Sequence, residues 1–239
     1  VTFSYPGAEK PVLSDISFQA KTGEVTAIIG GTGSGKTKIV NLIPRFYDVS
    51  NGAVRINGAD VRGISQGEVR SKIGFVPQKA LLFSGTIAEN IRFGKEDASL
   101  DEIIHASRIA QAEDFIEKME QGYDTMISQG GTNISGGQKQ RLSIARALVR
   151  KPAIYIFDDS FSALDYKTDA KLRAALKEET KESIVILVAQ RVSTVMDADQ
   201  IIVLDKGKIA GIGTHRELLT NNDVYQEIVA SQLSEEEIA

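Results

Sequence analysis

Short apolar runs divide this chain into regions with different expected secondary structure. Runs with the length of buried strands occur at residues 153–157, 183–189 and 201–204, with helix-like periodicity near 165–179, 192–197 and 214–220. A hairpin turn at 205–207 follows the last of these runs. This alternation of strands and helices predicts βαβ units around a parallel sheet.

The first third of the chain has a different pattern. Residues 1–5 alternate between apolar and polar side chains, and 12–20 is a second strand-like run. Asn-Gly pairs at 51–52 and 57–58 flank the stretch 53–56, a strong pattern for a hairpin. We therefore expect short antiparallel strands that form a flank beside the parallel sheet.

Helical periodicity dominates the middle of the chain. Residues 99–102 fit a capping box, which predicts the start of a helix, and two further helices are expected over 112–119 and 136–150. The last of them has a buried stripe that includes Leu142 and Ala145.

These patterns predict a core with an insertion. We expect residues 1–80 and 152–233 to form the core with its antiparallel flank, and 81–151 to form an inserted helical subdomain. Residues 234–239 form an acidic tail, which we expect to be frayed and solvated.

Composition narrows the possible functions. The net charge of −4 argues against a broad basic surface for nucleic acid. The absence of cysteine excludes disulfides, thiol catalysis and thiolate metal sites. No apolar run approaches the roughly 20 residues that cross a bilayer, so a membrane function would place the membrane part in another segment or subunit.

A glycine-rich loop follows the apolar strand at residues 25–29. It fits G-x-x-x-x-G-K-[ST] and consists of Gly30, Gly31, Thr32, Gly33, Ser34, Gly35, Lys36 and Thr37. Backbone N–H groups of such a loop surround triphosphate oxygens, the lysine reaches the β- and γ-phosphates, and the Thr37 hydroxyl binds Mg²⁺. A glycine-rich turn that only links strand to helix is the alternative, but such a turn has no use for Lys36. The loop therefore predicts binding of ATP with Mg²⁺.

Asp158 supplies a second element of a nucleotide site. It ends the apolar strand at 153–157, and ligands in α/β sheets bind at the carboxyl ends of strands. Its carboxylate could hold Mg²⁺ directly or through water, or it could only cap the next segment. With the loop, it predicts an α/β fold of the P-loop NTPase (RecA-like) class, with a parallel-sheet core, an antiparallel β flank and an inserted α-helical subdomain.

Further motifs give the chain a family resemblance. Residues 133–138 contain Ser135, Gly136, Gly137 and Gln138 and are similar to the LSGGQ signature of ATP-binding cassette (ABC) proteins, with Ile134 in place of leucine. The phosphate loop, Gln78, this signature, Asp158, residues 162–165 and a switch position at Gln190 occur in that family's order. The resemblance covers essentially the whole chain, and residues 82–91 resemble the stretch after the glutamine loop of exporter cassettes.

The resemblance implies a head-to-tail cassette dimer with two ATP molecules between the subunits. Each site would join one chain's phosphate loop to the other chain's signature, where Ser135 and the glycine amides suit a γ-phosphate. Ser135 and Gln138 also fit a capping box, which is compatible with that role. Gln78 would contact Mg²⁺, and Tyr5 matches the aromatic residue that stacks on adenine, although it could be an ordinary edge-strand side chain.

Two positions depart from the family's catalytic pattern. Asp159 stands where hydrolytic relatives carry Glu, so its carboxylate falls short by roughly 1 Å, a misplacement that can cost about 100-fold in rate. Gln190 stands where relatives carry His; it can donate a hydrogen bond but cannot become cationic. The alternative is that both changes are neutral.

These departures resemble the degenerate-site subunit of a bacterial heterodimeric exporter. The resemblance implies a partner cassette with the consensus Glu and His, a transmembrane domain outside this chain, and a location at the cytoplasmic face of the cell membrane. Two alternatives remain: a cassette ATPase of nucleic-acid repair or translation, and a regulatory ATP-binding module without hydrolysis. Direct insertion into the bilayer and binding of nucleic acid are not expected.

Overall fold

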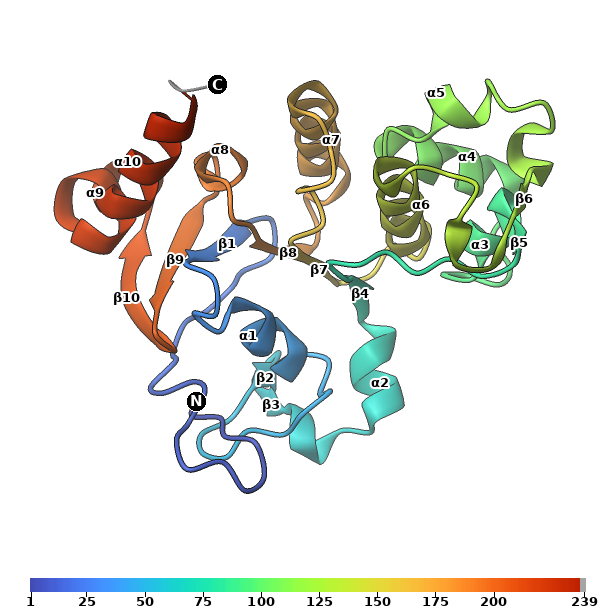
Figure 1. Cartoon of the computed structure of the whole chain (residues 1–239). Coiled ribbons are helices and arrows are strands. Elements are labelled where there is room, and N and C mark those ends of the chain that lie inside the picture. Colours follow the sequence, from blue (N-terminus) through green and yellow to red (C-terminus); the bar gives the residue numbers. More distant parts are fainter. Residues whose placement is uncertain (237–239) are drawn as a thin grey trace. The chain divides into compact units, whose positions relative to one another are not determined.

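The computed structural model describes residues 1–236 (Figure 1). The chain forms two compact units. The first combines Val1–Ile73 with the segment that begins at Ile184, and the second is Gly74–Ser183. The second unit is wider than the expected helical insertion, because it also holds the strand and helix after residue 151; the expected boundaries at 81 and 151 stay a prediction.

A mainly parallel sheet forms the centre of the first unit. Strand β1 (Val25–Gly30) lies between β8 (Ile184–Val188) and β9 (Gln200–Asp205) and pairs in parallel with both. Strand β10 (Lys208–Gly213) pairs antiparallel with β9 through the expected turn at 205–207. Strands β1, β8 and β9 are continuous apolar runs and are buried along almost their whole length, as expected of strands covered on both faces, whereas β10 at the edge alternates between exposed and half-buried residues.

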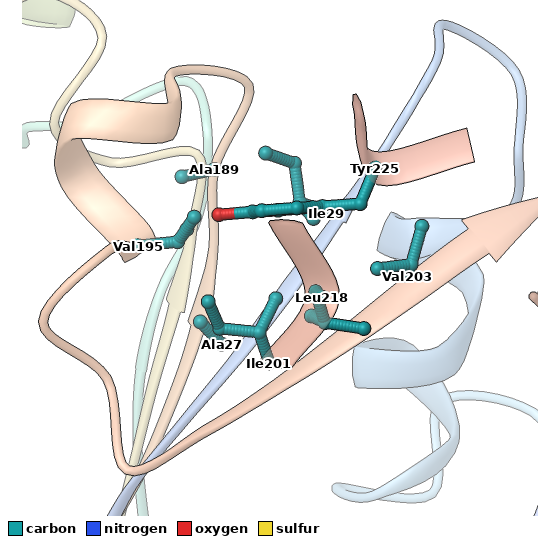
Figure 2. Close-up of a cluster of buried hydrophobic side chains, with 8 residues drawn as sticks. All are labelled: Ala27, Ile29, Ala189, Val195, Ile201, Val203, Leu218 and Tyr225. Atoms are coloured by element: carbon teal, nitrogen blue, oxygen red, sulfur yellow. The ribbon is translucent and has the colours of Figure 1, made fainter. Parts of the chain in front are cut away.

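Helices and a small hairpin complete the first unit. The hairpin joins β2 (Arg55–Ile56) to β3 (Ala59–Asp60) at the predicted Asn-Gly turn. The helical segments are α1 (Lys36–Leu42), η1 (Val61–Gly63), α2 (Gln66–Ser71), α8 (Val192–Val195), α9 (His215–Asn221) and α10 (Asp223–Glu236). Figure 2 shows the core in which Tyr225 of α10 packs over Ile29 and toward Ala189.

The strands expected at 1–5 and 12–20 are wrong as continuous elements. In the described residues these segments form only isolated bridges: Phe3 pairs with Leu13, and Thr2 pairs with Asn51, which lies outside both segments. The backbone gives the reason: Asp15 has a left-handed φ of 55°, which interrupts the second run.

The second unit contains strands and a group of packed helices. Strand β7 (Ile154–Asp158) neighbours β4 (Ile73–Val76), and β5 (Gly85–Thr86) pairs with β6 (Met126–Ile127). The helical segments are α3 (Ile87–Arg92), α4 (Leu100–Ile109), α5 (Glu113–Ile116), η2 (Gly122–Asp124), η3 (Gln129–Gly131), α6 (Gly136–Leu148) and α7 (Tyr166–Glu179).

Helix α6 is the central element of this group. Helices α3 and α4 pack against it, and its predicted stripe of Leu142, Ala145 and Leu148 is buried. Capping boxes start all three helices: Thr86 with Glu89, Ser99 with Glu102, and Ser135 with Gln138. Local sequence therefore sets where each helix begins, and packing of its apolar face stabilises it.

The C-terminal segment differs from the expectation. Helix α10 continues to Glu236, so residues 234–236 of the expected tail are helical, whereas 237–239 lie outside the described residues. Across the part of the chain that the structure describes, no helix combines the length and apolar character that a membrane span requires.

Candidate functional site

The glycine-rich loop joins the end of β1 to the start of α1. Gly33 and Gly35 have left-handed φ angles of 77° and 107°. A side chain at Gly30 would clash, because its Cβ would lie 2.3 Å from the carbonyl oxygen of Leu204 on β9. Glycine is therefore required at these positions by the turn and by the close approach of the neighbouring strand.

The loop leaves its backbone open on one side and holds a cation. A Cβ at Gly31 or Gly33 would meet no atom within 4 Å. The Lys36 ammonium donates to the carbonyl oxygens of Gly30 at 2.6 Å and Gly31 at 2.9 Å, so the charge lies within the curve of the loop. The buried Ser34 hydroxyl has no hydrogen-bond partner among the described residues. Accessible backbone, a central cation and an unused hydroxyl fit phosphate groups.

Tyr5 lies in an aromatic cluster of the same unit. Its ring packs edge-on against Phe3 and Tyr47, with centroids 5.1 and 5.6 Å apart, and the Lys38 ammonium lies 5.2 Å from its centroid. Gln190, also in this unit, is exposed and directly follows β8 and the buried Ala189.

In the second unit, two adjacent carboxylates follow the buried strand β7. Asp158 is 4% exposed and Asp159 is 7% exposed. Asp159 has a left-handed φ of 48°, and its carbonyl oxygen accepts a hydrogen bond from the Ser162 hydroxyl at 3.0 Å. The Ser160 hydroxyl donates to the carbonyl of Val76 at 2.9 Å. The turn after β7 is thus held by its own serines.

Gln78 and Asp159 are in direct contact. The Gln78 Nε2 group donates to Asp159 Oδ2 at 3.0 Å. The sequence predicts separate roles for these residues, at the metal and at the attacking water, and no local pattern indicates this bond. Only the fold could reveal it, because the two residues lie 81 positions apart.

The predicted signature forms the start of α6. Ser135 is the N-cap: its hydroxyl accepts from the Gln138 amide at 3.2 Å, and the Gln138 side chain accepts from the Ser135 amide at 3.0 Å. A Cβ at Gly136 would meet open space, whereas one at Gly137 would lie 3.2 Å from the carbonyl of Ala163. The expected capping box is therefore present, and the backbone at Gly136 is accessible.

Sequence reasoning missed Arg146, a structural cation of the second unit. It donates to the carbonyl oxygens of Leu81 and Asn90, each at 2.8 Å, and lies over the rings of Phe83 and Phe93. Burial lowers the pKa of its guanidinium to about 10, far above neutral pH, so it stays charged. The sequence feature that could have identified this residue is an arginine within the apolar stripe of α6.

The side chains suit Mg²⁺ better than a metal held by protein alone. Among the side chains that the structure describes, no three His, Cys, Asp or Glu gather as a metal site. Thr37, Asp158 and Gln78 offer a hydroxyl, a carboxylate and an amide oxygen. Mg²⁺ commonly takes one or two protein oxygens and completes its shell with phosphate oxygens and water, so each of these side chains is of a type that Mg²⁺ accepts.

The strand, glycine-rich loop and helix around Lys36 define a P-loop nucleotide-binding domain. The profile of a family described as ABC transporter matches residues 13–162. The chain belongs to the ABC transporter family, with the P-loop cassette fold and a mixed parallel and antiparallel sheet, and as a member of it binds MgATP.

Similar proteins agree with this assignment. An ABC transporter ATP-binding protein of Mycobacterium tuberculosis is 51% identical over 97% of this chain and 40% of its own length. A putative multidrug export ATP-binding/permease protein of Staphylococcus aureus is 42% identical over 97% of this chain and 40% of its own length. A solved bacterial Atm1-family ABC exporter with ATP bound has a TM-score of 0.94 and 39% identity, over 97% of this chain and 41% of that one. The chain thus spans about 40% of the length of these relatives.

Proposed function

We propose that this chain is the ATP-binding cassette of an exporter, and that its own ATP site hydrolyses slowly. It would pair head-to-tail with a second cassette at the cytoplasmic face of a membrane. The exporter names of a relative and of the similar solved structure support the transport role. The contact between Gln78 and Asp159 carries the proposal of slow hydrolysis.

The binding roles follow from the loop. Lys36 would move from its carbonyl partners to the phosphates, which are stronger partners because they are anionic. Thr37, Asp158 and Gln78 would hold Mg²⁺, and the ring of Tyr5 would stack on adenine. Mg²⁺ would neutralise phosphate charge during the reaction.

Two features of Asp159 support slow hydrolysis: its side chain is short, and one of its carboxylate oxygens already accepts a hydrogen bond. Its carboxylate is one methylene shorter than that of Glu, and the backbone turn that carries it is held by Ser162. The Gln78 amide already uses one oxygen of that carboxylate. A water molecule would therefore lack a correctly placed acceptor, while the phosphate loop that binds ATP is unchanged. Gln190 would still donate a hydrogen bond to a γ-phosphate but could not take up a proton.

The signature would serve the partner's site. Ser135 and Gly136 retain a capped helix start with accessible backbone, so they can contact a γ-phosphate bound by another cassette. The chain would thus contribute an intact half to a site whose Glu and His come from the partner.

A second surface of the same unit suits a membrane domain. Leu81, Phe83 and Phe93 are 61%, 49% and 66% exposed, around the Arg146 guanidinium. Large exposed apolar side chains gathered in one place mark interaction sites. We assign this surface to a helix of the transmembrane partner, since Phe83 belongs to the exporter-like stretch 82–91 and Leu81 and Phe93 flank it.

The test is to purify the full-length protein from its native membrane and to sequence the cassette that copurifies with it. We expect a different chain with Glu and His at the positions of Asp159 and Gln190. A homodimer in which both sites carry Asp and Gln would contradict the division of labour. As a functional control, Lys36→Ala should spare most of the ATPase activity, whereas the equivalent lysine substitution in the partner should abolish it.

A further inference from the structure

The C-terminal helix α10 contacts the segment that carries the switch position. Gln232 Nε2 donates to the carbonyl oxygen of Gln190 at 2.7 Å, and Gln232 Oε1 accepts from the amide of Val192 at 2.7 Å. One side-chain amide therefore binds two backbone groups on either side of Arg191. We propose that Gln232 is a positioning residue, which fixes the backbone of Gln190 for contact with the bound nucleotide.

Gln232 supplies a hydrogen-bond acceptor to the backbone segment that links β8 to α8. The segment lies between the end of β8 at Val188 and the start of α8 at Val192. The N-cap of α8, Arg191, makes no side-chain capping bond. The first amide of a helix has no partner within the helix, so the Gln232 oxygen performs the task of a cap from a distant part of the chain.

Helix α10 is itself held firmly. Tyr225 is fully buried in the cluster that contains Ala189 and Val195 (Figure 2), and its hydroxyl lies 2.7 Å from His215 Nδ1. Tyr225 and Gln232 are seven residues apart, two helical turns, so they share one face of α10. The first anchors that face in the core beside Ala189, and the second reaches the next residue, Gln190.

The contact from Gln232 matters more because the switch position holds glutamine, Gln190, rather than histidine. A Gln side chain has one more rotatable bond than His, so its amide group has more conformations to lose on binding. Fixing the carbonyl of Gln190 and the amide of Val192 restricts the backbone from which that side chain extends. The part of this inference that concerns nucleotide rests on the proposed role of Gln190; the backbone contact does not.

The decisive experiment is amide hydrogen exchange on the full protein, with and without ATP, for Gln232→Leu. Loss of the side-chain acceptor of the part-buried Val192 amide should speed exchange at Val192 about tenfold, which corresponds to about 1.4 kcal/mol. Gln226→Ala is the matched control, because Gln226 also lies on α10 and bonds the carbonyl of Leu219 at 2.7 Å, away from the switch segment. It should leave exchange at Val192 unchanged.

ATP gives the second readout. We expect ATP to slow exchange over residues 190–192, and Gln232→Leu to lose most of that slowing while the Kd for ATP changes less than about twofold, since the phosphate loop is intact. Gln232→Glu retains an acceptor for the Val192 amide. In the absence of ATP, exchange at Val192 should therefore be closer to that of the unchanged protein than in Gln232→Leu. This variant keeps the test valid if the leucine variant unfolds.

Two results distinguish failure of the positioning role of Gln232 from failure of the proposed function of Gln190. Unchanged Val192 exchange in Gln232→Leu, with α10 still protected, would overturn the positioning role. Absence of any ATP effect over 190–192 in the unchanged protein would instead reject the proposed function of Gln190, because the comparison without nucleotide does not depend on it.

Discussion

Asp159→Glu tests the proposed site most directly. The substitution adds one methylene, or about 1 Å of reach, to a carboxylate on a turn that Ser162 holds in place. A misplacement of about 1 Å costs on the order of 100-fold in rate, equivalent to about 2.7 kcal/mol of barrier. The longer carboxylate can also extend past the Gln78 amide, which now occupies one of its oxygens.

The expected result is a rise of about 10- to 100-fold in hydrolysis at this site. The assay is single-turnover release of γ-phosphate by the proposed complex with a second cassette. The catalytic carboxylate expected in that cassette is removed, so that only this site contributes. ATP binding is measured separately and should be unaffected, because Lys36 and its loop lie on a different element.

Two controls accompany the substitution. Asp159→Asn keeps the shape but removes the charge and should give no increase. Asp101→Glu makes the same Asp-to-Glu change at an exposed position in the first turn of α4 and should leave turnover unchanged. The reasoning is refuted if Asp159→Glu binds ATP normally but releases phosphate no faster than the unchanged protein.

Three further predictions address other residues. In the Asp159→Glu background, Gln190→His should introduce a titration near pH 6.5 into the pH–rate profile; superimposable profiles with Gln and His would contradict a role at the phosphate. Lys36→Ala should weaken ATP binding about 10- to 100-fold in equilibrium titrations. Lys38→Ala removes only a cation over Tyr5 and should weaken ATP binding less than about fivefold. Equal losses of affinity in the two variants would argue against the central role of Lys36. Arg146→Lys should lower the free energy of unfolding by about 2 kcal/mol in urea titrations, since lysine cannot reproduce the planar set of hydrogen bonds. The same substitution at the exposed Arg150 should change the free energy of unfolding little. A loss below about 0.5 kcal/mol for Arg146→Lys would show that the guanidinium geometry is unimportant.

The positions of the core strands along the chain could be predicted where a strand has a continuous apolar run. The strands after residue 153, the turn at 205–207 and the hairpin around Asn57 are all present in the structure. Helices with capping boxes were also predictable, as Ser99 and Ser135 demonstrate, because side-chain and backbone partners lie three residues apart.

Other features depended on tertiary contacts that no local pattern encodes. Helix α10 was not expected, although Tyr225 in its first turns is fully buried. The bonds from Gln78 to Asp159 and from Gln232 to Gln190 span 81 and 42 positions. The site residues themselves were identified by motif, while their partners became visible only in the folded chain.

The left-handed backbone at Asp159 bears on which carboxylate side chain suits this position. Aspartate tolerates a φ of 48° more readily than most side chains, because its short carboxylate can bond locally, whereas glutamate has no such compensation. Under the proposed function, aspartate in place of glutamate at this turn would relax the main chain and slow hydrolysis. If a second cassette performs the cleavage, as proposed, the transporter would lose little activity by this replacement.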